Sequence, residues 1–452
     1  MAESYVTKFT KYVAEQRDNL EGKLISKGLI PSANASLGSL VADLDNLQES
    51  FKTLKYERDE NFPDFDDMFD KDPLRAINGG QYKACIYMLL PLVNNELVCN
   101  ILDPKPSDTA STATKYYGEK VVISDGTEYE NVTTTLTHAM GDSGIYTDSD
   151  GFKFGLIKIY SSRVLKQSNG YFCPYAREII DDYWSVYYPY TNMGKPTGLD
   201  SFELKYWRFV CSNTTLADTS GWQLPYKSGL ANESYLILDS VEHLRIDGLF
   251  KFTTFANLLG WAKLNVLDLR GTMLNTDTET SLSLTFGSAG QTHGYGPALL
   301  DYVKTPYSNV PLTVTIYEDV KNLNITDNVA KCIINTGSGS YGRTGQMILE
   351  KIHLGNGLQY SLTQGLNYAW FTNLKHVTCS VNTFGKNESA ITVDFGYAPK
   401  LTKQSILNMF NNFADRTDKT ANILKLAKYS EQYLTDEEKA ILTNKNWTLT
   451  FV

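Results

Sequence analysis

Residues 241–246 read VEHLRI, and the same apolar spacing returns four more times along the chain. The other copies are LNVLDL at 264–269, VKNLNI at 320–325, LEKIHL at 349–354 and LKHVTC at 374–379. Each copy has an apolar residue, two variable residues, a second apolar residue, one variable residue and a third apolar residue. The second and third apolar residues are two positions apart, so they share one face of a strand, while the first lies at the turn into it.

The intervals between these copies predict a stack of strands. Their first residues lie 23, 56, 29 and 25 residues apart, and the long interval fits two rungs of about 28 residues. A single strand of this kind cannot bury its apolar face alone, so successive strands must stack. We therefore expect a leucine-rich-repeat-like solenoid over residues 236–400. The alternative is that short alternating phrases recur by chance in a β-rich chain.

Length and composition indicate a globular chain with more than one domain. The 452 residues suffice for two or three cores, and 42 % hydrophobic and 21 % charged residues are ordinary values. The net charge of −9 gives no electrostatic footprint for nucleic acid or anionic lipid. No run approaches the roughly 20 apolar residues of a membrane helix, and the N-terminus lacks a signal pattern. We expect no nucleic-acid partner, no membrane insertion, and synthesis in a cytoplasm without export by the usual route.

The first 51 residues predict two amphipathic helices. Apolar residues recur mostly at helical steps over residues 3–27, and Gly28 suits a C-cap, while Ser36 caps a second helix. Neither helix has enough neighbouring sequence to cover its apolar face, so we expect residues 1–51 to serve attachment or oligomerisation. The residues assigned to this contact are Phe9, Tyr12, Leu20, Leu24, Leu40 and Leu44.

Two segments of different composition follow. Residues 52–79 are acidic, with five aspartates between Asp64 and Asp72, and no spacing there matches a known cation-binding loop. A solvated linker is favoured over a cation site. Residues 80–235 show apolar runs with partial alternation, separated by turn clusters, which predicts a β-sandwich-like domain of short antiparallel strands. The six scattered cysteines include no C-x-x-C pair, so we interpret them as buried thiols.

Residues 401–452 predict a compact α/β cap. Thr402 begins a helix, residues 423–426 form a short strand, and residues 447–452 alternate as a final strand. Thr435 and Glu438 form a capping box that begins a second helix through Leu442. A cap of this kind covers the exposed end of a repeat stack. The expected fold class is therefore α+β, mainly β, with N-terminal helices, a sandwich-like domain, a solenoid and this cap.

The C-terminal sequence carries a resemblance. It reads LTKQSI at 401–406, NNFADRT at 411–417, LTDEEKAI at 434–441 and KNWT at 445–448. This resembles the end of phage and prophage proteins with BspA-like leucine-rich repeats, which are common in gut bacteria, although Asn446 stands where that group usually has glycine. The phrase LISKG at 24–28, followed by Ala35, Ser36 and Leu37, is similar to the helical segment that opens many phage tail-associated proteins.

The resemblance implies a structural virion protein of a tailed phage, either a tail fibre or another appendage. It also implies contact with other virion proteins, assembly with copies of itself as a trimer, and attachment to a host surface glycan or protein. The family brings no catalytic residue, metal or cofactor. The rival hypotheses are a bacterial leucine-rich-repeat surface adhesin and a glycan-degrading tailspike.

One aromatic stretch is a candidate binding region. Residues 171–190 contain eight aromatic side chains with carboxylates between them, a combination that suits sugar rings or protein interfaces. Packing in the core of the β domain is the favoured alternative. The residues assigned to binding are Tyr175, Tyr183, Trp184, Tyr187 and Tyr188, and the carboxylates that a glycan-cleaving enzyme would use are Glu178, Asp181 and Asp182.

Other motifs favour no chemistry. Residues 141–144 read GDSG, as in trypsin-like proteases, but His138 lies too close in sequence to Ser143 to act as the base of that fold. Residues 148–151 read DSDG without the other ligands of a calcium loop, which favours a β-turn. The five histidines lack zinc-ligand spacing, and His353 and His376 are expected on the outer face of the stack. We therefore expect no enzyme activity.

Overall fold

The computed structural model describes residues 59–99, 118–132, 135–162, 175–182, 202–211, 240–250, 254–255, 263–273, 280–286, 300–308, 310–316, 320–334, 349–359 and 371–452. Contacts divide the chain into two units, residues 1–55 and 56–452, and the described residues belong to the second. The predicted N-terminal helices, with Phe9, Tyr12, Leu20, Leu24, Leu40 and Leu44, lie outside the described residues. Strands predominate and helices are few, so the expected α+β, mainly β class is confirmed.

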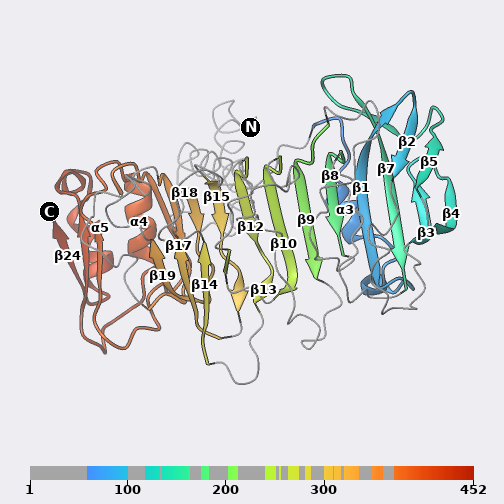
Figure 1. Cartoon of the computed structure of the whole chain (residues 1–452). Coiled ribbons are helices and arrows are strands. Elements are labelled where there is room, and N and C mark those ends of the chain that lie inside the picture. The colour runs from blue at the N-terminus through green and yellow to red at the C-terminus, as the bar shows by residue number, and fades with distance from the viewer. Residues whose placement is uncertain are drawn as a thin grey trace, which may run out of the picture. The chain divides into compact units, whose positions relative to one another are not determined.

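Parallel strands form the centre of the largest sheet. They lie side by side in sequence order, as Figure 1 shows. Each of them pairs in parallel with the next. The strands are β8 (Glu178–Asp181), β9 (Tyr206–Cys211), β10 (His243–Phe250), β12 (Val266–Leu269), β15 (Leu300–Lys304), β18 (Val320–Asn324), β20 (Lys351–Leu354) and β21 (His376–Cys379).

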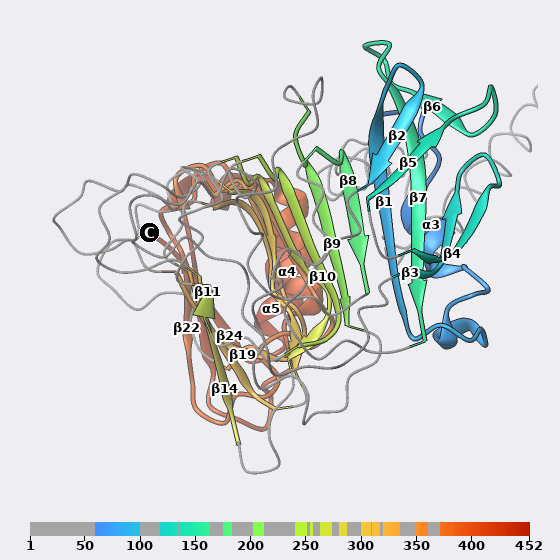
Figure 2. The same cartoon turned by 45° about the vertical axis from the view of Figure 1, so that its right-hand side comes forward.

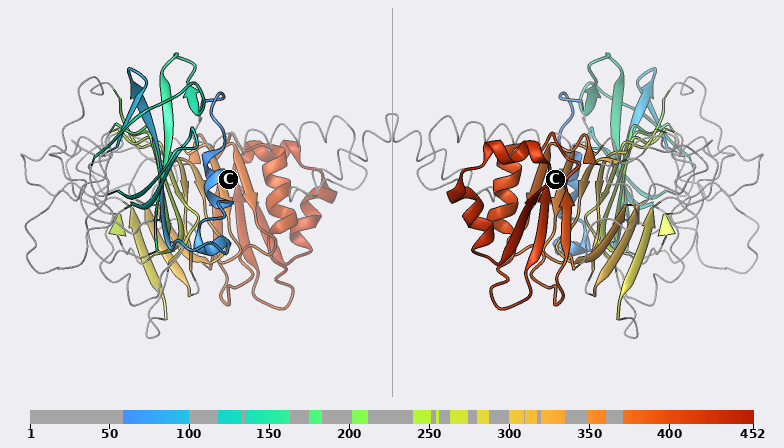
Figure 3. Two further views of the ribbon diagram at one scale, coloured as in Figure 1. Left: turned by 90° about the vertical axis from the view of Figure 1, so that its right-hand side faces the viewer. Right: turned by 90° about the vertical axis from the view of Figure 1, so that its left-hand side faces the viewer.

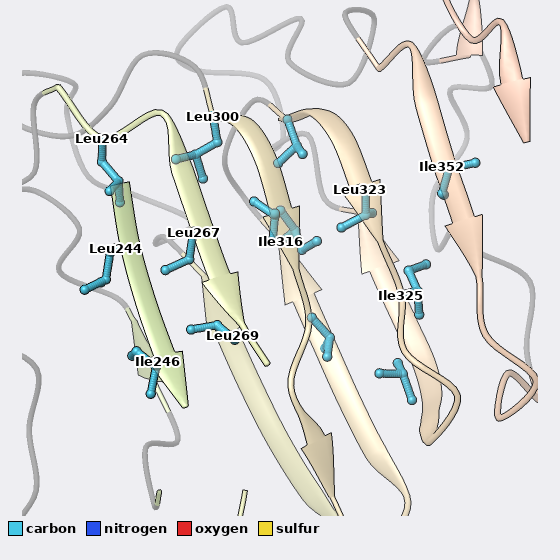
Figure 4. Close-up of a cluster of buried hydrophobic side chains, with 14 of the residues drawn as sticks. Leu244, Ile246, Leu264, Leu267, Leu269, Leu300, Ile316, Leu323, Ile325 and Ile352 are labelled. Carbon is cyan, nitrogen blue, oxygen red and sulfur yellow. The ribbon is translucent and has the colours of Figure 1, made fainter. Parts of the chain in front are cut away.

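The repeated phrases supply the core beneath these strands. Every apolar residue of the five phrases is at most 8 % exposed. Strand register places Leu244 beside Leu267, and Ile352 beside Val377. Figure 4 shows Leu244, Leu267 and Ile352 among the buried side chains on one face of neighbouring strands. Full burial of one such side chain contributes roughly 1.5–3 kcal/mol, so the aligned apolar rows are the main source of stability for this sheet.

The long interval between the second and third phrases holds one further strand of the stack, β15. Its apolar positions are Leu300 and Val303, both fully buried, and Thr305 stands where the third apolar residue would be. The Thr305 hydroxyl lies 3.0 Å from the hydroxyl of Thr326, which follows β18. A buried hydroxyl that is hydrogen-bonded carries little desolvation cost, which explains how a polar residue is accommodated here.

A second parallel sheet faces the first across the core. It consists of β11 (Thr254–Phe255), β14 (Leu282–Phe286), β17 (Leu312–Ile316) and β19 (Val329–Ile334). Figure 2 shows the two sheets facing each other, with β14 on one side and β10 on the other. Leu284 and Val314 of this sheet share one hydrophobic cluster with Leu267. Two short strands continue the pairing beyond the end of β12: β13 (Thr272–Met273) pairs with the last residues of β10, and β16 (Tyr307–Ser308) pairs with β13.

Antiparallel strands form the N-terminal end of the large sheet. Strand β1 pairs antiparallel with β7 and with β8, so these strands and the parallel ones belong to one sheet. Strands β9 and β10, which lie on the two sides of residue 235 in sequence, pair within this sheet. The boundary of a separate sandwich-like domain at residue 235 stays a prediction. The strands are β1 (Ala84–Val93), β2 (Glu96–Cys99), β3 (Gly118–Ile123), β4 (Glu128–Val132), β5 (Leu136–Ala139), β6 (Ile145–Thr147) and β7 (Lys153–Ser161).

The acidic stretch, expected to be a solvated linker, instead forms packed structure over its described residues 59–79. It contains α3 (Phe65–Asp70) and the 3-10 helix η1 (Ala76–Asn78). Phe65 and Phe69 are at most 1 % exposed. The sequence pattern showed the charge of this stretch, whereas its phenylalanines decide its placement, because burying them outweighs the solvation of the aspartates between them.

The C-terminal residues close the stack. They form β22 (Thr392–Phe395), α4 (Lys403–Asn412), β23 (Asn422–Leu426), the 3-10 helix η6 (Lys428–Tyr433), α5 (Asp436–Thr443) and β24 (Trp447–Phe451). Thr402 caps α4, and Thr435 with Glu438 forms the predicted capping box of α5. Strands β22, β23 and β24 make a third parallel sheet. Figure 3 shows α4 and α5 beside these strands, at the end of the large sheet opposite β3 and β4.

Candidate functional site

The outer face of the parallel strands carries two rows of side chains that alternate with the buried rows, and we call these two rows the polar face. Because neighbouring strands are about 4.8 Å apart, side chains in a row lie next to one another. Strand register aligns the first row as Tyr206, His243, Val266, Tyr302, Asn322, Lys351 and His376. It aligns the second row as Arg208, Arg245, Asp268, Lys304, Asn324, His353 and Thr378.

Helix α3 packs at the N-terminal end of the polar face. Asp64 caps the helix by accepting a hydrogen bond from the Asp67 backbone N–H at 3.1 Å. The Phe69 ring packs edge-on against Tyr87 of β1, with 5.1 Å between ring centroids. The apolar side of this short helix therefore anchors it to the sheet, and its aspartates Asp66 and Asp70 reach the polar face.

Arg208 on β9 is the centre of an ion-pair network between α3 and the sheet. Its guanidinium donates to Asp247 at 2.5 Å, to Asp66 at 3.0 Å and to Asp70 at 2.7 Å. The Arg208 side chain is only 4 % exposed. Burial alone would lower the pKa of Arg208, but the carboxylates of Asp247 and Asp66 outweigh it and raise the pKa above its usual value. The buried cation is therefore fully compensated.

Two further arginines extend this network across the sheet. Arg245 on β10 lies 2.9 Å from Asp247 and 3.5 Å from Asp66. Arg270 donates to Asp268 and lies 3.8 Å from Asp247. Burial lowers the pKa of Arg270, but its bond to Asp268 more than offsets this, and the pKa is raised. Strands β9, β10 and β12 with α3 thus form a charge-compensated region, which we call the closed half of the polar face.

His243 is a neutral member of the closed half. Its ring meets the Tyr206 ring edge-on at 5.0 Å between centroids, and the residue is 4 % exposed. Burial lowers the pKa of the His243 imidazole to about 4, although Asp268 opposes the shift. The imidazole is therefore uncharged at neutral pH and acts as a packing residue.

A second buried network lies beside α3. The Asp72 carboxylate accepts hydrogen bonds from the hydroxyls of Tyr87 at 2.7 Å and Tyr160 at 2.6 Å. Burial raises the pKa values of both tyrosines. Arg75 donates to Asp182 at 2.8 Å, and both side chains are at most 4 % exposed. The partners are hydrogen-bonded to one another and buried, as in a structural network.

The carboxylates considered for glycan cleavage are placed by this network. Glu178, Asp181 and Asp182 are each at most 5 % exposed. Asp182 is paired with Arg75. Asp181 is the last residue of β8, and Asp182 follows the strand. The burial of all three side chains differs from the open groove that two glycan-cleaving carboxylates line.

Strands β15, β18, β20 and β21 carry the rest of the polar face, which we call the open half. The Asn324 amide donates to the Tyr302 hydroxyl at 3.2 Å. The two ring nitrogens of His353 lie 2.9 Å from the Thr378 hydroxyl and 3.2 Å from the Ser380 hydroxyl. Burial lowers the pKa of His353. The two rows of the open half thus carry amides, hydroxyls, the imidazoles of His353 and His376, and the lysines Lys304 and Lys351.

The open half carries two lysines, Lys304 in the second row and Lys351 in the first row. The Lys304 ammonium lies 5.9 Å from the centroid of the Tyr307 ring, and no described carboxylate lies within salt-bridge distance of it. Burial lowers the pKa of Lys304, with Asp268 on the neighbouring strand opposing the shift. Close by in the first row, Asn322 is 5 % exposed, and its side-chain carbonyl accepts no hydrogen bond from any described residue. A partly buried cation and an unused amide acceptor are groups that a polar ligand can satisfy.

The sequence-predicted binding residues are only partly described. Tyr175 is fully buried, and its hydroxyl donates to the Val98 carbonyl at 3.0 Å, which agrees with the core alternative for this residue. Tyr183, Trp184, Tyr187 and Tyr188 lie outside the described residues. Sequence reasoning missed Tyr302 and Lys304, because the phrase that contains them ends in Thr305. Leu300 and Val303 have the spacing of the first two apolar residues of the phrase, and this spacing was the sequence signal for the strand.

His353 and His376 both belong to the polar face, on neighbouring strands and in different rows, since register pairs His353 with Thr378 and Lys351 with His376. His138 lies elsewhere and is bound on both sides. Its two ring nitrogens are 2.7 Å from Asp125 and 2.8 Å from the Tyr129 hydroxyl. The ring is therefore held in place by two neighbours, and neither nitrogen is directed at Ser143.

The DSDG motif forms a turn. The Gly151 backbone N–H donates to the Asp148 carbonyl at 3.0 Å, and the Asp148 carboxylate accepts from the Phe152 N–H at 2.8 Å. Among the described residues, no group of His, Cys, Asp and Glu side chains is arranged to hold a metal ion. No helix within the described ranges is long and apolar enough to cross a membrane. Comparisons of the chain with known protein families, with curated proteins and with solved structures gave no match.

Proposed function

We propose that this protein is a structural and binding component of a phage particle, a tail fibre or another appendage, which attaches to a host surface. The proposal combines the resemblance of the C-terminal sequence with the polar face. In it, the stack of parallel strands is a leucine-rich-repeat-like solenoid, and residues 401–452 are its cap. The open half of the polar face is the surface that contacts the host.

The observation that carries the proposal is the difference between the two halves of one sheet face. In the closed half, three arginines are matched by Asp66, Asp70, Asp247 and Asp268. In the open half, the same row continues as Lys304, Asn324, His353 and Thr378. Because the charges of the closed half satisfy one another, their role is to hold α3. Of the remaining polar groups, the Lys304 ammonium and the Asn322 side-chain carbonyl are the ones that we propose for recognition.

The chemistry of the open half suits a hydroxylated ligand. Amide side chains both donate and accept hydrogen bonds, and tyrosine offers a ring face as well as a hydroxyl. Lys304 adds one positive charge, which favours a glycan that bears carboxylate or phosphate groups over a neutral one. We therefore propose an acidic surface glycan as the ligand, bound along the rows and across the strands.

Binding of the purified chain to host cell-wall and capsular glycan tests this proposal. We expect Lys304→Ala combined with Asn324→Ala to weaken binding at least about tenfold, the loss of two polar contacts. Lys71→Ala removes the exposed lysine that caps the C-terminus of α3 and should leave affinity unchanged. Equal binding by the double variant and the wild type would refute the assignment of the open half.

A separate experiment tests whether the protein is part of a phage particle. An antibody against the chain should label purified phage particles in electron micrographs. Labelling of the surface of uninfected bacteria would instead favour the rival hypothesis of a bacterial surface adhesin. Glycan binding without any virion labelling would retain the binding surface and refute the phage assignment.

A further inference from the structure

The edges of the sheets are closed in different ways. At β21, the last strand of the large sheet, α4 covers the edge. The backbone N–H groups of Val377 and Cys379 donate to the Ser405 hydroxyl at 3.0 Å and to the Asn408 amide oxygen at 2.8 Å. Side chains of a helix thus replace the next strand. Natural sheets commonly protect their edges by such covering, or by charges and prolines.

Strand β24 is an edge without these protections. Among the described strands it pairs only with β23. The Val452 backbone N–H donates to the Leu426 carbonyl at 2.9 Å, and the Val452 carbonyl accepts from the Lys428 N–H at 2.7 Å. Backbone groups alternate along a strand, so those of Leu449 and Phe451 point away from β23. In Figure 1, β24 is the last strand at the C-terminal side of the stack.

The sequence of β24 also lacks the residues that prevent strand pairing. It reads WTLTF, with neither charge nor proline, and Thr448 is exposed. Strand β4, near the opposite end of the large sheet, instead carries Glu128 and Glu130. An uncharged edge next to another uncharged edge has no like-charge repulsion to overcome.

We propose that β24 pairs with β24 of a second copy of this chain, antiparallel and about a twofold axis through Leu449. This register sets Leu449 against Leu449 of the second copy, Thr448 against Thr450, and Trp447 against Phe451. Strands of one sequence satisfy a twofold interface because the two surfaces are identical. The two three-stranded sheets become one continuous sheet of six strands.

Exposed apolar side chains near the end of β24 enlarge this surface. Val452 and Tyr429 are 53 % and 57 % exposed. Tyr429 follows Lys428, whose N–H is bound by Val452, and its ring meets that of Tyr433 at 5.1 Å between centroids. Tyrosine is enriched in protein interfaces, where its ring is buried at low entropic cost. A strand edge beside exposed tyrosines provides more contact area than five residues of backbone pairing alone.

Light scattering of the full chain with charged variants tests the proposal. Thr448→Lys with Thr450→Lys places lysine opposite lysine, and Thr448→Glu with Thr450→Glu places glutamate opposite glutamate. Each variant alone should have half the molar mass of the wild type at equal concentration, and a 1:1 mixture of the two should restore the wild-type mass. Thr443→Lys with Asn444→Lys adds the same charge at the C-terminal end of α5, outside β24, and should keep the wild-type mass.

Residues 1–58 are present in all of these proteins, so assembly through the N-terminal helices would change every mass by the same factor. Recovery of mass on mixing shows that the single variants are folded. Equal masses for all variants, or a lysine variant and a glutamate variant that remain apart on mixing, would overturn the proposal. These outcomes do not depend on glycan binding or on virion labelling.

Discussion

Removal of the Arg208 side chain is the sharpest test of how α3 is attached to the sheet. The substitution Arg208→Ala deletes a guanidinium that is bonded to three carboxylates, two on α3 and one on β10. It also removes the cation from the face of the Phe69 ring, 5.6 Å from its centroid. The perturbation therefore acts on the contact between residues 65–70 and the strands, and not on the repeat core.

The size of the expected stability loss follows from the burial of the carboxylates that Arg208 binds. The side chains of Asp66 and Asp247 are 21 % and 11 % exposed, so both remain mostly desolvated after their partner is deleted. Breaking a buried ion pair by removing one partner costs about 3–5 kcal/mol, because an uncompensated charge is left behind. Arg245 stays within 2.9 Å of Asp247 and 3.5 Å of Asp66 and compensates part of this charge. We therefore expect the free energy of unfolding to fall by about 3 kcal/mol, the lower end of that range.

Urea unfolding followed by tryptophan fluorescence measures this loss, because Trp207 neighbours Arg208 in β9. The control is Lys71→Ala, which removes an ion pair between side chains that are 75 % and 53 % exposed. Exposed pairs contribute about 0–1 kcal/mol. Limited proteolysis should also cut residues 59–79 sooner in Arg208→Ala than in Lys71→Ala. If the two substitutions cost the same, the Arg208 network does not hold α3, and the division of the polar face into two halves fails.

Three further substitutions probe the other parts of the structure. The folded-state pKa of His243, about 4, lies below its ordinary 6.5, so the stability that depends on the neutral imidazole is complete above pH 6.5 and is lost as the pH falls towards 4. At pH 5 this loss is about 2 kcal/mol of unfolding free energy. A His243→Gln variant should therefore show a smaller fall in unfolding free energy between pH 7 and pH 5 than the wild type. Leu267→Ala empties a fully buried position and should cost about 2–5 kcal/mol in urea unfolding, whereas a comparable loss for half-buried Val266→Ala would contradict the assigned strand faces. Ser405→Ala leaves a buried N–H of β21 without its acceptor and should lower stability by about 1–3 kcal/mol; an equal effect of the exposed Ser389→Ala would show that α4 does not close the edge.

The repeat strands were predictable because their signal is local. Each phrase places two apolar residues on one strand face within six positions, and every rung repeats that constraint. The start of α5 was predictable for a similar reason, since Thr435 and Glu438, three positions apart, form its capping box. Such patterns depend on neighbours in sequence, which a single sequence displays directly.

The placement of α3 was not predictable in this way. The hydrogen bonds from Arg208 join residues 138 and 142 positions apart in sequence. No periodicity links an acidic stretch to an arginine at that separation, so the aspartates near residue 66 read as solvated. Their solvent exposure is decided by Phe65 and Phe69, which bury the helix and bring the carboxylates within reach of the strand.

The sequence predicted where the polar face lies, but not which of its side chains belong to the closed half and which to the open half. The variable positions of the phrase had to point outward, and His353 and His376 do so. Which of these positions are already compensated depends on ion pairs that form only when α3 is in place. Lys304 is an example: its neighbour in the row is Asp268, and the nearest partner of that carboxylate is Arg270.

The two ends of the sheet together determine where recognition can occur. At one end the aspartates of α3 pair with Arg208 of β9 and Arg245 of β10, and Arg270 pairs with Asp268 of β12, so the charges of this end are already matched. At the other end α4 uses its polar side chains to bind the backbone edge of β21. Neither device engages the outward side chains of β15 and β18, so Tyr302, Lys304 and Asn324 retain capacity for hydrogen bonds. A ligand that binds the chain through this sheet face should therefore cross these middle strands. Substitutions in the rungs at either end should change stability before they change affinity.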